Sequence, residues 1–173
     1  MEKLYHISED PKIKIFEPRP ASYYPEHILR KAVFAISGQL LHNYLLPRDC
    51  PRVTFYAGPG TAETDKARFL GNSTAAYIVA VESAWLRDIQ QAIIYCYELP
   101  ADTFSLFDKC AGYYVSQLSV VPISVRPIYN VMEEMLKRNV ELRFMPSITG
   151  LANAVKQSTL NFSLIRMQHV KKV

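Results

Sequence analysis

Short apolar runs recur along this chain, and proline or glycine follows several of them within a few residues. The clearest are residues 32–37 (AVFAIS), which are continuously apolar, and residues 92–99 (AIIYCYEL), which are β-branched and aromatic. Runs of this length and composition are typical of buried β-strands. Further strand patterns lie at residues 3–8, 53–57, 76–81, 112–117, 120–125, 140–145 and 161–167.

Helical spacing is confined to a few segments inserted singly between these runs. Residues 127–138 predict an amphipathic helix ended by Asn139, and a second helix follows Pro146. Shorter helices are expected at residues 38–45 and 82–89. This order predicts an α+β fold, in which one globular domain over residues 1–173 contains a twisted mixed β-sheet and several short helices. Residues 120–145 are the one stretch that could form a parallel crossover.

The amino-acid composition argues against some kinds of ligand site. Hydrophobic residues make up 49% and charged residues 21% of the 173, as in ordinary globular domains. Six glycines argue against glycine-rich phosphate cradles, whereas proline and tyrosine are both frequent, at 11 each. Pro18, Pro20 and Pro25 enclose a stiff loop with Tyr23 and Tyr24, which is either the wall of a site or a surface crossing.

Charge, cysteines and hydropathy indicate the environment. The net charge of +4 is compatible with an anionic ligand but does not require one. Three cysteines without a CxxC pair fit a reducing cytoplasm, with no disulfide framework and no metal site. The N-terminus has no secretory signal pattern, and no apolar run is long enough to cross a membrane. We therefore expect a cytoplasmic protein.

His6 and Ser8 lie on one face of the first predicted strand. In a cleft, a neutral imidazole there could bind a ligand hydroxyl or act as an acid or base. The alternative is a core histidine with one satisfied nitrogen.

The segment at residues 48–52 places Arg48 and Arg52 around Asp49 and Cys50, with prolines on both sides. Arginine side chains match the geometry of phosphate and carboxylate groups. Alternatively, Asp49 pairs with one arginine in a structural turn and Cys50 is buried and inert. A nucleophilic role for Cys50 is the weaker hypothesis, because no histidine is its neighbour in the sequence.

Two further groups of residues are candidates for ligand binding or catalysis. In a strand over residues 112–117, Tyr114 and Ser116 would share one face and Tyr113 the other. The tyrosines could stack on a flat base or simply pack across strands. Glu82 and Glu98 end predicted strands and are candidate catalytic carboxylates or surface residues.

The chain resembles a small bacterial family of uncharacterised proteins. The motifs that carry this resemblance are residues 4–11 (LYHISEDP), 16–20, 47–55 (PRDCPRVTF), 111–116 (AGYYVS) and 158–163. It extends over nearly the whole chain and implies no known activity.

The LYHIS motif is also similar, more distantly, to the first strand of ADP-ribosyltransferase-like folds. This resemblance implies that His6 holds the ribose or nicotinamide amide of NAD, the substrate, with Ser8 beside it. It further implies a phosphate-binding arginine at Arg48 or Arg52, a stacking tyrosine at Tyr56 or Tyr113, and an acid at Glu82 or Glu98. The chain departs from the pattern because residues 32–37 lack the expected second-strand tyrosine.

The sequence thus predicts a cleft lined by His6, Arg48, Arg52 and one or both of Tyr113 and Tyr114. The first hypothesis is an NAD- or nucleotide-handling enzyme. The second is a non-catalytic module that binds a phosphorylated small molecule or nucleic acid, and the third is a structural or interaction protein. The oligomeric state does not follow from the sequence.

Overall fold

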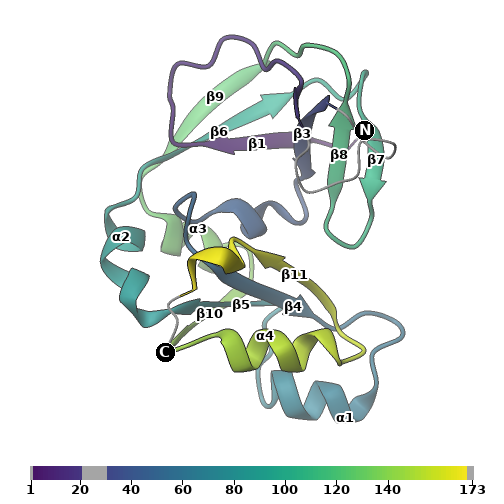
Figure 1. The fold of residues 1–173 in the computed structure, drawn as a ribbon, viewed down its shortest axis with the longest axis vertical. Helices are drawn as coiled ribbons and strands as arrows, with labels where there is room; N and C mark the ends of the chain where they lie inside the picture. Colours follow the sequence, from purple (N-terminus) through teal and green to yellow (C-terminus); the bar gives the residue numbers. More distant parts are fainter. Residues whose placement is uncertain (1, 21–30, 171–173) are drawn as a thin grey trace. The chain divides into compact units, whose positions relative to one another are not determined.

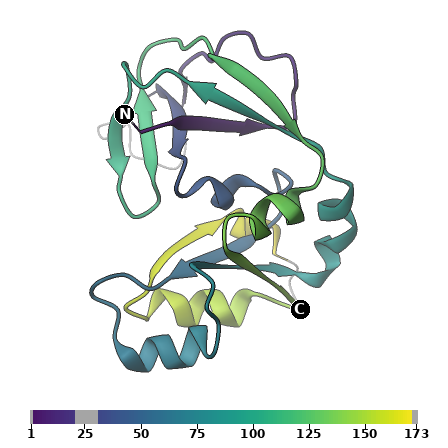
Figure 2. The ribbon, with the colours of Figure 1, turned by 180° about the vertical axis from the view of Figure 1, so that it is seen from behind.

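The computed structural model describes residues 2–20 and 31–170, so the predicted Tyr23–Tyr24 loop lies outside the described residues. Figures 1 and 2 trace the chain from opposite sides. Strands and short helices alternate irregularly, which confirms the α+β class. The chain divides into two compact units: unit 1 contains Met1–Leu41 and Ile94–Ile128, and unit 2 contains His42–Ile93 and Tyr129–Val173. That residues 1–173 act as one domain stays a prediction.

Unit 1 is built on an antiparallel sheet. Its strands follow the order β7-β8-β3-β1-β6-β9, and β2 pairs with β3. The strands are β1 (Leu4–Ser8), β2 (Arg19–Pro20), β3 (Lys31–Ser37), β6 (Ile94–Leu99), β7 (Ser105–Asp108), β8 (Tyr113–Ser116) and β9 (Ser124–Ile128).

The core of unit 1 lies on one face of this sheet. Side chains alternate along a strand, so Leu4 shares its face with Leu99, its partner across the β1–β6 ladder. Val33 and Ala35 of β3 belong to the same buried cluster. Phe16 covers this face, and its backbone exchanges two hydrogen bonds with Val120 (2.8 and 2.9 Å).

Unit 2 contains a four-stranded sheet in the order β10-β5-β4-β11. Its strands are β4 (Arg52–Tyr56), β5 (Tyr77–Glu82), β10 (Val140–Met145) and β11 (Asn161–Ile165). β10 runs parallel to β5, whereas β4 is antiparallel to both β5 and β11.

Short helices accompany the unit 2 sheet. They are α1 (Glu63–Asp65), η2 (Lys66–Leu70), η3 (Ser83–Trp85), α2 (Leu86–Gln91), α3 (Val131–Leu136), α4 (Thr149–Lys156) and η4 (Met167–His169). One more, η1 (Leu41–Tyr44), lies where unit 1 passes into unit 2. α4 runs along the sheet (Figure 1), and Ala152, Val155 and the N-cap residue Ile148 are buried with Val53 and Phe55 of β4. This apolar stripe confirms the helix predicted after Pro146.

The segment before α3 differs from the prediction. Pro127 and Ile128 belong to β9, and the helix begins at Val131, because Asn130 caps it by accepting a hydrogen bond from the Glu133 backbone N–H (3.1 Å). Pro127 is tolerated there because β9 ends the strand order and is an edge strand. Asn139 has the positive φ (57°) expected of a residue that ends a helix.

The predicted parallel crossover is wrong. β9 belongs to the unit 1 sheet and β10 to the unit 2 sheet, so they cannot form one βαβ unit. The prediction also missed β7, because Phe104, Leu106 and Phe107 have a spacing that resembles one helical turn. In the described part of the chain, no helix is both long and apolar enough to cross a membrane.

Candidate functional site

His6 lies where β1 and β3 separate. The ladder between them covers two residue pairs, Leu4 with Ser37 and Tyr5 with Ile36, whereas β1 pairs with β6 along all five of its residues. Just beyond the β1–β3 ladder, the His6 Nδ1 atom lies 2.9 Å from the Phe34 carbonyl oxygen of β3. The imidazole thus supplies the link between β1 and β3 after the backbone ladder has ended.

This contact defines the protonation pattern of a neutral His6. A carbonyl oxygen can only accept a hydrogen bond, so Nδ1 carries the proton and Nε2 carries the lone pair. The side chain is half-buried. Nε2 therefore has the chemistry to accept a hydrogen bond from a hydroxyl or an amide N–H.

An aromatic ring packs on the imidazole, and a second ring packs on the first. The Phe16 ring centroid lies 4.7 Å from that of His6 and 5.3 Å from that of Tyr97, edge-on to the latter. Tyr97 is the partner of His6 across the β1–β6 ladder and is fully buried. Ser8, on the same face, accepts a hydrogen bond from the Asp10 backbone N–H (3.1 Å) and so shapes the turn after β1.

The residues of β8 divide between the two faces, as predicted. Tyr114 lies opposite Ala35 and Ser116 opposite Val33, on the face of His6, while Tyr113 lies opposite Ile36 on the other face. Tyr113 and Tyr114 therefore cannot both line one surface with His6.

Two hydroxyl groups of β8 form hydrogen bonds within unit 1. The Tyr114 hydroxyl donates to the Glu2 carboxylate (2.6 Å), and this bond raises the pKa of Tyr114. Ser116 is 1% exposed and its hydroxyl contacts the Thr103 hydroxyl (3.0 Å), which makes it a packing residue rather than a ligand contact.

Glu98 lies on the opposite sheet face from His6, because its cross-strand partner is Tyr5. It precedes the last residue of β6 and forms an ion pair with Lys3 (3.2 Å). The hydrogen bond to Glu98 raises the pKa of Lys3. This placement separates Glu98 from the imidazole face on which it would need to act together with His6.

In unit 2, Arg52 is a structural clamp. It is 1% exposed, and its Nε donates to the Asn43 carbonyl (2.9 Å) while Nη1 donates to the carbonyls of Pro47 (3.2 Å) and Cys50 (2.9 Å). The guanidinium also lies 5.6 Å from the Tyr44 ring centroid. These contacts close the loop that precedes β4, so the predicted anion-binding role does not fit Arg52.

The other candidate residues of this loop differ in their exposure and in their contacts. Arg48 is exposed, and its carbonyl accepts a hydrogen bond from Arg166 Nε (3.1 Å). Asp49 contacts Arg166 (4.0 Å) and His169 (3.6 Å) instead of an arginine of its own segment. Cys50 is buried, and burial raises its pKa to about 12, which supports the inert alternative over a nucleophile.

Tyr56 and Glu82 complete the predicted set. The Tyr56 ring packs edge-on against Tyr77 (5.1 Å between centroids), and Tyr77 packs against His42 (4.1 Å). Glu82 ends β5, as predicted, and is 1% exposed. Because Arg48, Tyr56 and Glu82 belong to unit 2, a ligand shared with His6 stays a prediction.

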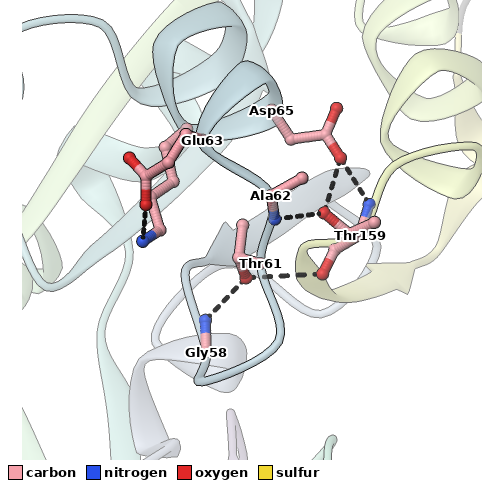
Figure 3. Close-up of polar contacts among 7 residues, drawn as sticks. Gly58, Thr61, Ala62, Glu63, Asp65 and Thr159 are labelled. Carbon is pink, nitrogen blue, oxygen red and sulfur yellow. Dashed lines mark hydrogen bonds and ion pairs between the residues drawn. The ribbon is translucent and has the colours of Figure 1, made fainter.

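A polar cluster that the sequence did not indicate joins α1 to the turn before β11 (Figure 3). The Asp65 carboxylate accepts from the Thr159 backbone N–H (2.7 Å) and hydroxyl (2.6 Å). These bonds lower the pKa of Asp65. The Thr159 hydroxyl in turn accepts from the Ala62 N–H (2.8 Å), and Thr61 accepts from the Gly58 N–H (2.8 Å). The donors and acceptors of this cluster bond to one another, so the cluster links α1 to the turn before β11. We call this link the staple.

Phe16 and Tyr97 are the residues around His6 that sequence reasoning missed. Their apolar neighbours indicated strand or core positions, and a sequence pattern does not reveal which strands pair. Among the described residues, no group of three or more His, Cys, Asp or Glu side chains is arranged to hold a metal ion.

Comparison with known proteins adds one relationship. The model of a family of unknown function (DUF6886) matches residues 5–170. The chain belongs to this family. No curated protein and no solved structure matches the chain. Membership confirms the expected relationship to a family without a known activity, and the likeness to ADP-ribosyltransferases stays a proposal.

Proposed function

We propose that this chain is an NAD- or nucleotide-handling enzyme resembling ADP-ribosyltransferases, with His6 orienting the ribose or the nicotinamide amide. The Nδ1 contact between His6 and the Phe34 carbonyl carries the proposal. With the proton on Nδ1, Nε2 is the acceptor atom of the ring, which is the chemistry that a ribose hydroxyl or a carboxamide N–H requires. Following the cysteine usage, we place this activity in the cytoplasm.

The position of His6 supports the proposal further. A histidine serving only as packing could bond to any nearby acceptor, whereas His6 bonds at the point where two strands diverge. The half-buried imidazole is held by neighbours on β3 and by Phe16, so little side-chain entropy would be lost on binding a ligand.

One observation favours the second candidate, a non-catalytic module that binds a phosphorylated small molecule or nucleic acid. Glu98, the candidate acid of unit 1, lies on the opposite sheet face from His6 and is paired with Lys3. Such a module needs no catalytic acid.

Isothermal titration with NAD, ADP-ribose and a short RNA tests binding in wild type and two matched variants. His6→Asn keeps a donor near Nδ1 but removes the Nε2 position, and His6→Gln does the reverse. We expect NAD affinity to fall about tenfold or more in His6→Asn, the equivalent of one hydrogen bond, and less in His6→Gln. Equal affinities in all three proteins, or no binding of NAD and ADP-ribose, would contradict the proposal.

Catalysis is tested separately, by following release of nicotinamide from NAD. Loss of turnover in Glu98→Gln or Glu82→Gln with binding retained would support the enzyme. Binding without turnover in wild type would favour the module.

A further inference from the structure

The Tyr97 hydroxyl is a polar group inside an apolar cluster. Tyr97 packs with Leu4, Phe16 and Leu99, where a phenylalanine ring would fill the same space without burying a hydroxyl. Burying a hydroxyl is unfavourable unless it is hydrogen-bonded. The bonds that this hydroxyl makes therefore indicate what it does.

Both hydrogen bonds of the hydroxyl go to the turn that follows β1. It donates to the Asp10 carbonyl (2.7 Å) and accepts from the Ile13 backbone N–H (3.2 Å). The Asp10 side chain also accepts from the Lys12 N–H (2.8 Å) inside this turn. Tyr97 thus ties the turn to β6 at two points.

The same segment continues to Phe16. The Phe16 ring contacts both the imidazole of His6 and the ring of Tyr97, which are cross-strand partners on one sheet face. The imidazole thus contacts the Phe34 carbonyl and the Phe16 ring, and Phe16 is held both by its backbone bridge to Val120 and by the turn that leads to it.

We propose that Tyr97 is the positioning residue for His6: its hydroxyl fixes the turn at residues 10–13, which sets Phe16 against the imidazole and keeps Nδ1 on the Phe34 carbonyl. The inference rests on the proposed function, because that function gives His6 a ligand to bind. It goes beyond that function in assigning Tyr97 a role that requires no contact with the ligand.

The test is the tautomer of His6, read from the imidazole nitrogen shifts of the ¹⁵N-labelled full chain at about pH 8, where an ordinary imidazole is neutral. His6→Gln assigns the signal. Tyr97→Phe keeps the ring and removes the hydroxyl. The matched control is Tyr95→Phe, because Tyr95 is half-buried on the same face of β6, opposite Ser8.

We expect a single Nδ1–H tautomer in wild type and Tyr95→Phe, and exchange between both tautomers in Tyr97→Phe. Phe16→Leu, which leaves the hydroxyl in place, is expected to mix the tautomers as well and serves if Tyr97→Phe does not fold. A pure Nδ1–H tautomer in either variant would overturn the inference, whatever its melting temperature. The readout uses no ligand, so a failure of NAD to bind would contradict the proposed function alone.

Discussion

At the scale of single residues, Arg52 holds the loop that leads into β4. Its guanidinium bonds to three carbonyls in a buried setting, and a lysine ammonium cannot reproduce that forked geometry. We expect Arg52→Met to lower the free energy of unfolding by about 3–5 kcal/mol and Arg52→Lys by about 1–3 kcal/mol. Urea unfolding measures both. Arg48→Lys, at an exposed position, should stay within about 0.5 kcal/mol of wild type.

If Arg52→Lys were as stable as wild type, the clamp would be unnecessary and Arg52 would again be a candidate for ligand binding.

Cys50 provides a second residue-level prediction. With a pKa of about 12, roughly one Cys50 thiol in ten thousand is ionised at about pH 8. Cys96 is also buried, whereas Cys110 is exposed. Titration of the native protein with a thiol reagent should therefore modify Cys110 rapidly and the other two only after denaturation. Rapid modification in Cys110→Ser would show that a buried thiol is accessible and contradict the assignment.

At the scale of elements, Gly112 is required where β8 begins. It has a φ of 70°, and a Cβ there would lie 2.8 Å from Ser37 Oγ and 2.9 Å from Leu40 Cδ1. Strain and overpacking together predict that Gly112→Ala lowers the free energy of unfolding by about 2–4 kcal/mol.

Gly150 is the matched control for this substitution, because it lies exposed in α4 and a Cβ added there would have no neighbour within 4 Å. Gly150→Ala should raise the free energy of unfolding by about 0.5–1 kcal/mol. Similar effects of the two substitutions in urea unfolding would contradict the different roles given to them.

The staple between α1 and β11 should depend on pH. Hydrogen bonds from Thr159 lower the pKa of Asp65 below its ordinary value of 3.8, so its contribution is present above that pH and is lost as the pH falls below it. The difference in urea midpoint between wild type and Asp65→Asn should therefore shrink from about pH 6 to about pH 3.

The control for the staple is the same substitution in a Thr159→Val background, where the difference at neutral pH should be smaller because the hydroxyl donor is gone. A difference that is constant with pH would show that the charge of Asp65 is not what Thr159 stabilises.

At the scale of the whole molecule, local patterns in the sequence predicted the α+β class and most elements. Alternation identified β1, and the apolar stripe of Ile148, Ala152 and Val155 identified α4, because each is decided by neighbours in the chain. The assignment of β9 and β10 to different sheets could not be predicted, since strand pairing depends on contacts between distant residues.

In the candidate site too, local features could be predicted from the sequence, whereas contacts between distant segments could not. His6 was found from its strand and motif, and the separation of Tyr113 from Tyr114 followed from alternation. The partners that define His6 — Phe34, Phe16 and Tyr97 — come from three other segments, which no local pattern connects to it. Arg52 was misjudged because a guanidinium in a proline-rich turn has the same sequence signature whether it faces a ligand or its own carbonyls.

The central claim is that His6 meets the ligand, and the imidazole signals of the labelled protein during an NAD titration test it most directly. We predict a saturable change at the His6 Nε2 resonance, with the Nδ1–H tautomer retained and the signals of His42 and His169 unchanged. A saturating titration that leaves the His6 resonances unchanged, or that moves only those of His169, would contradict the claim.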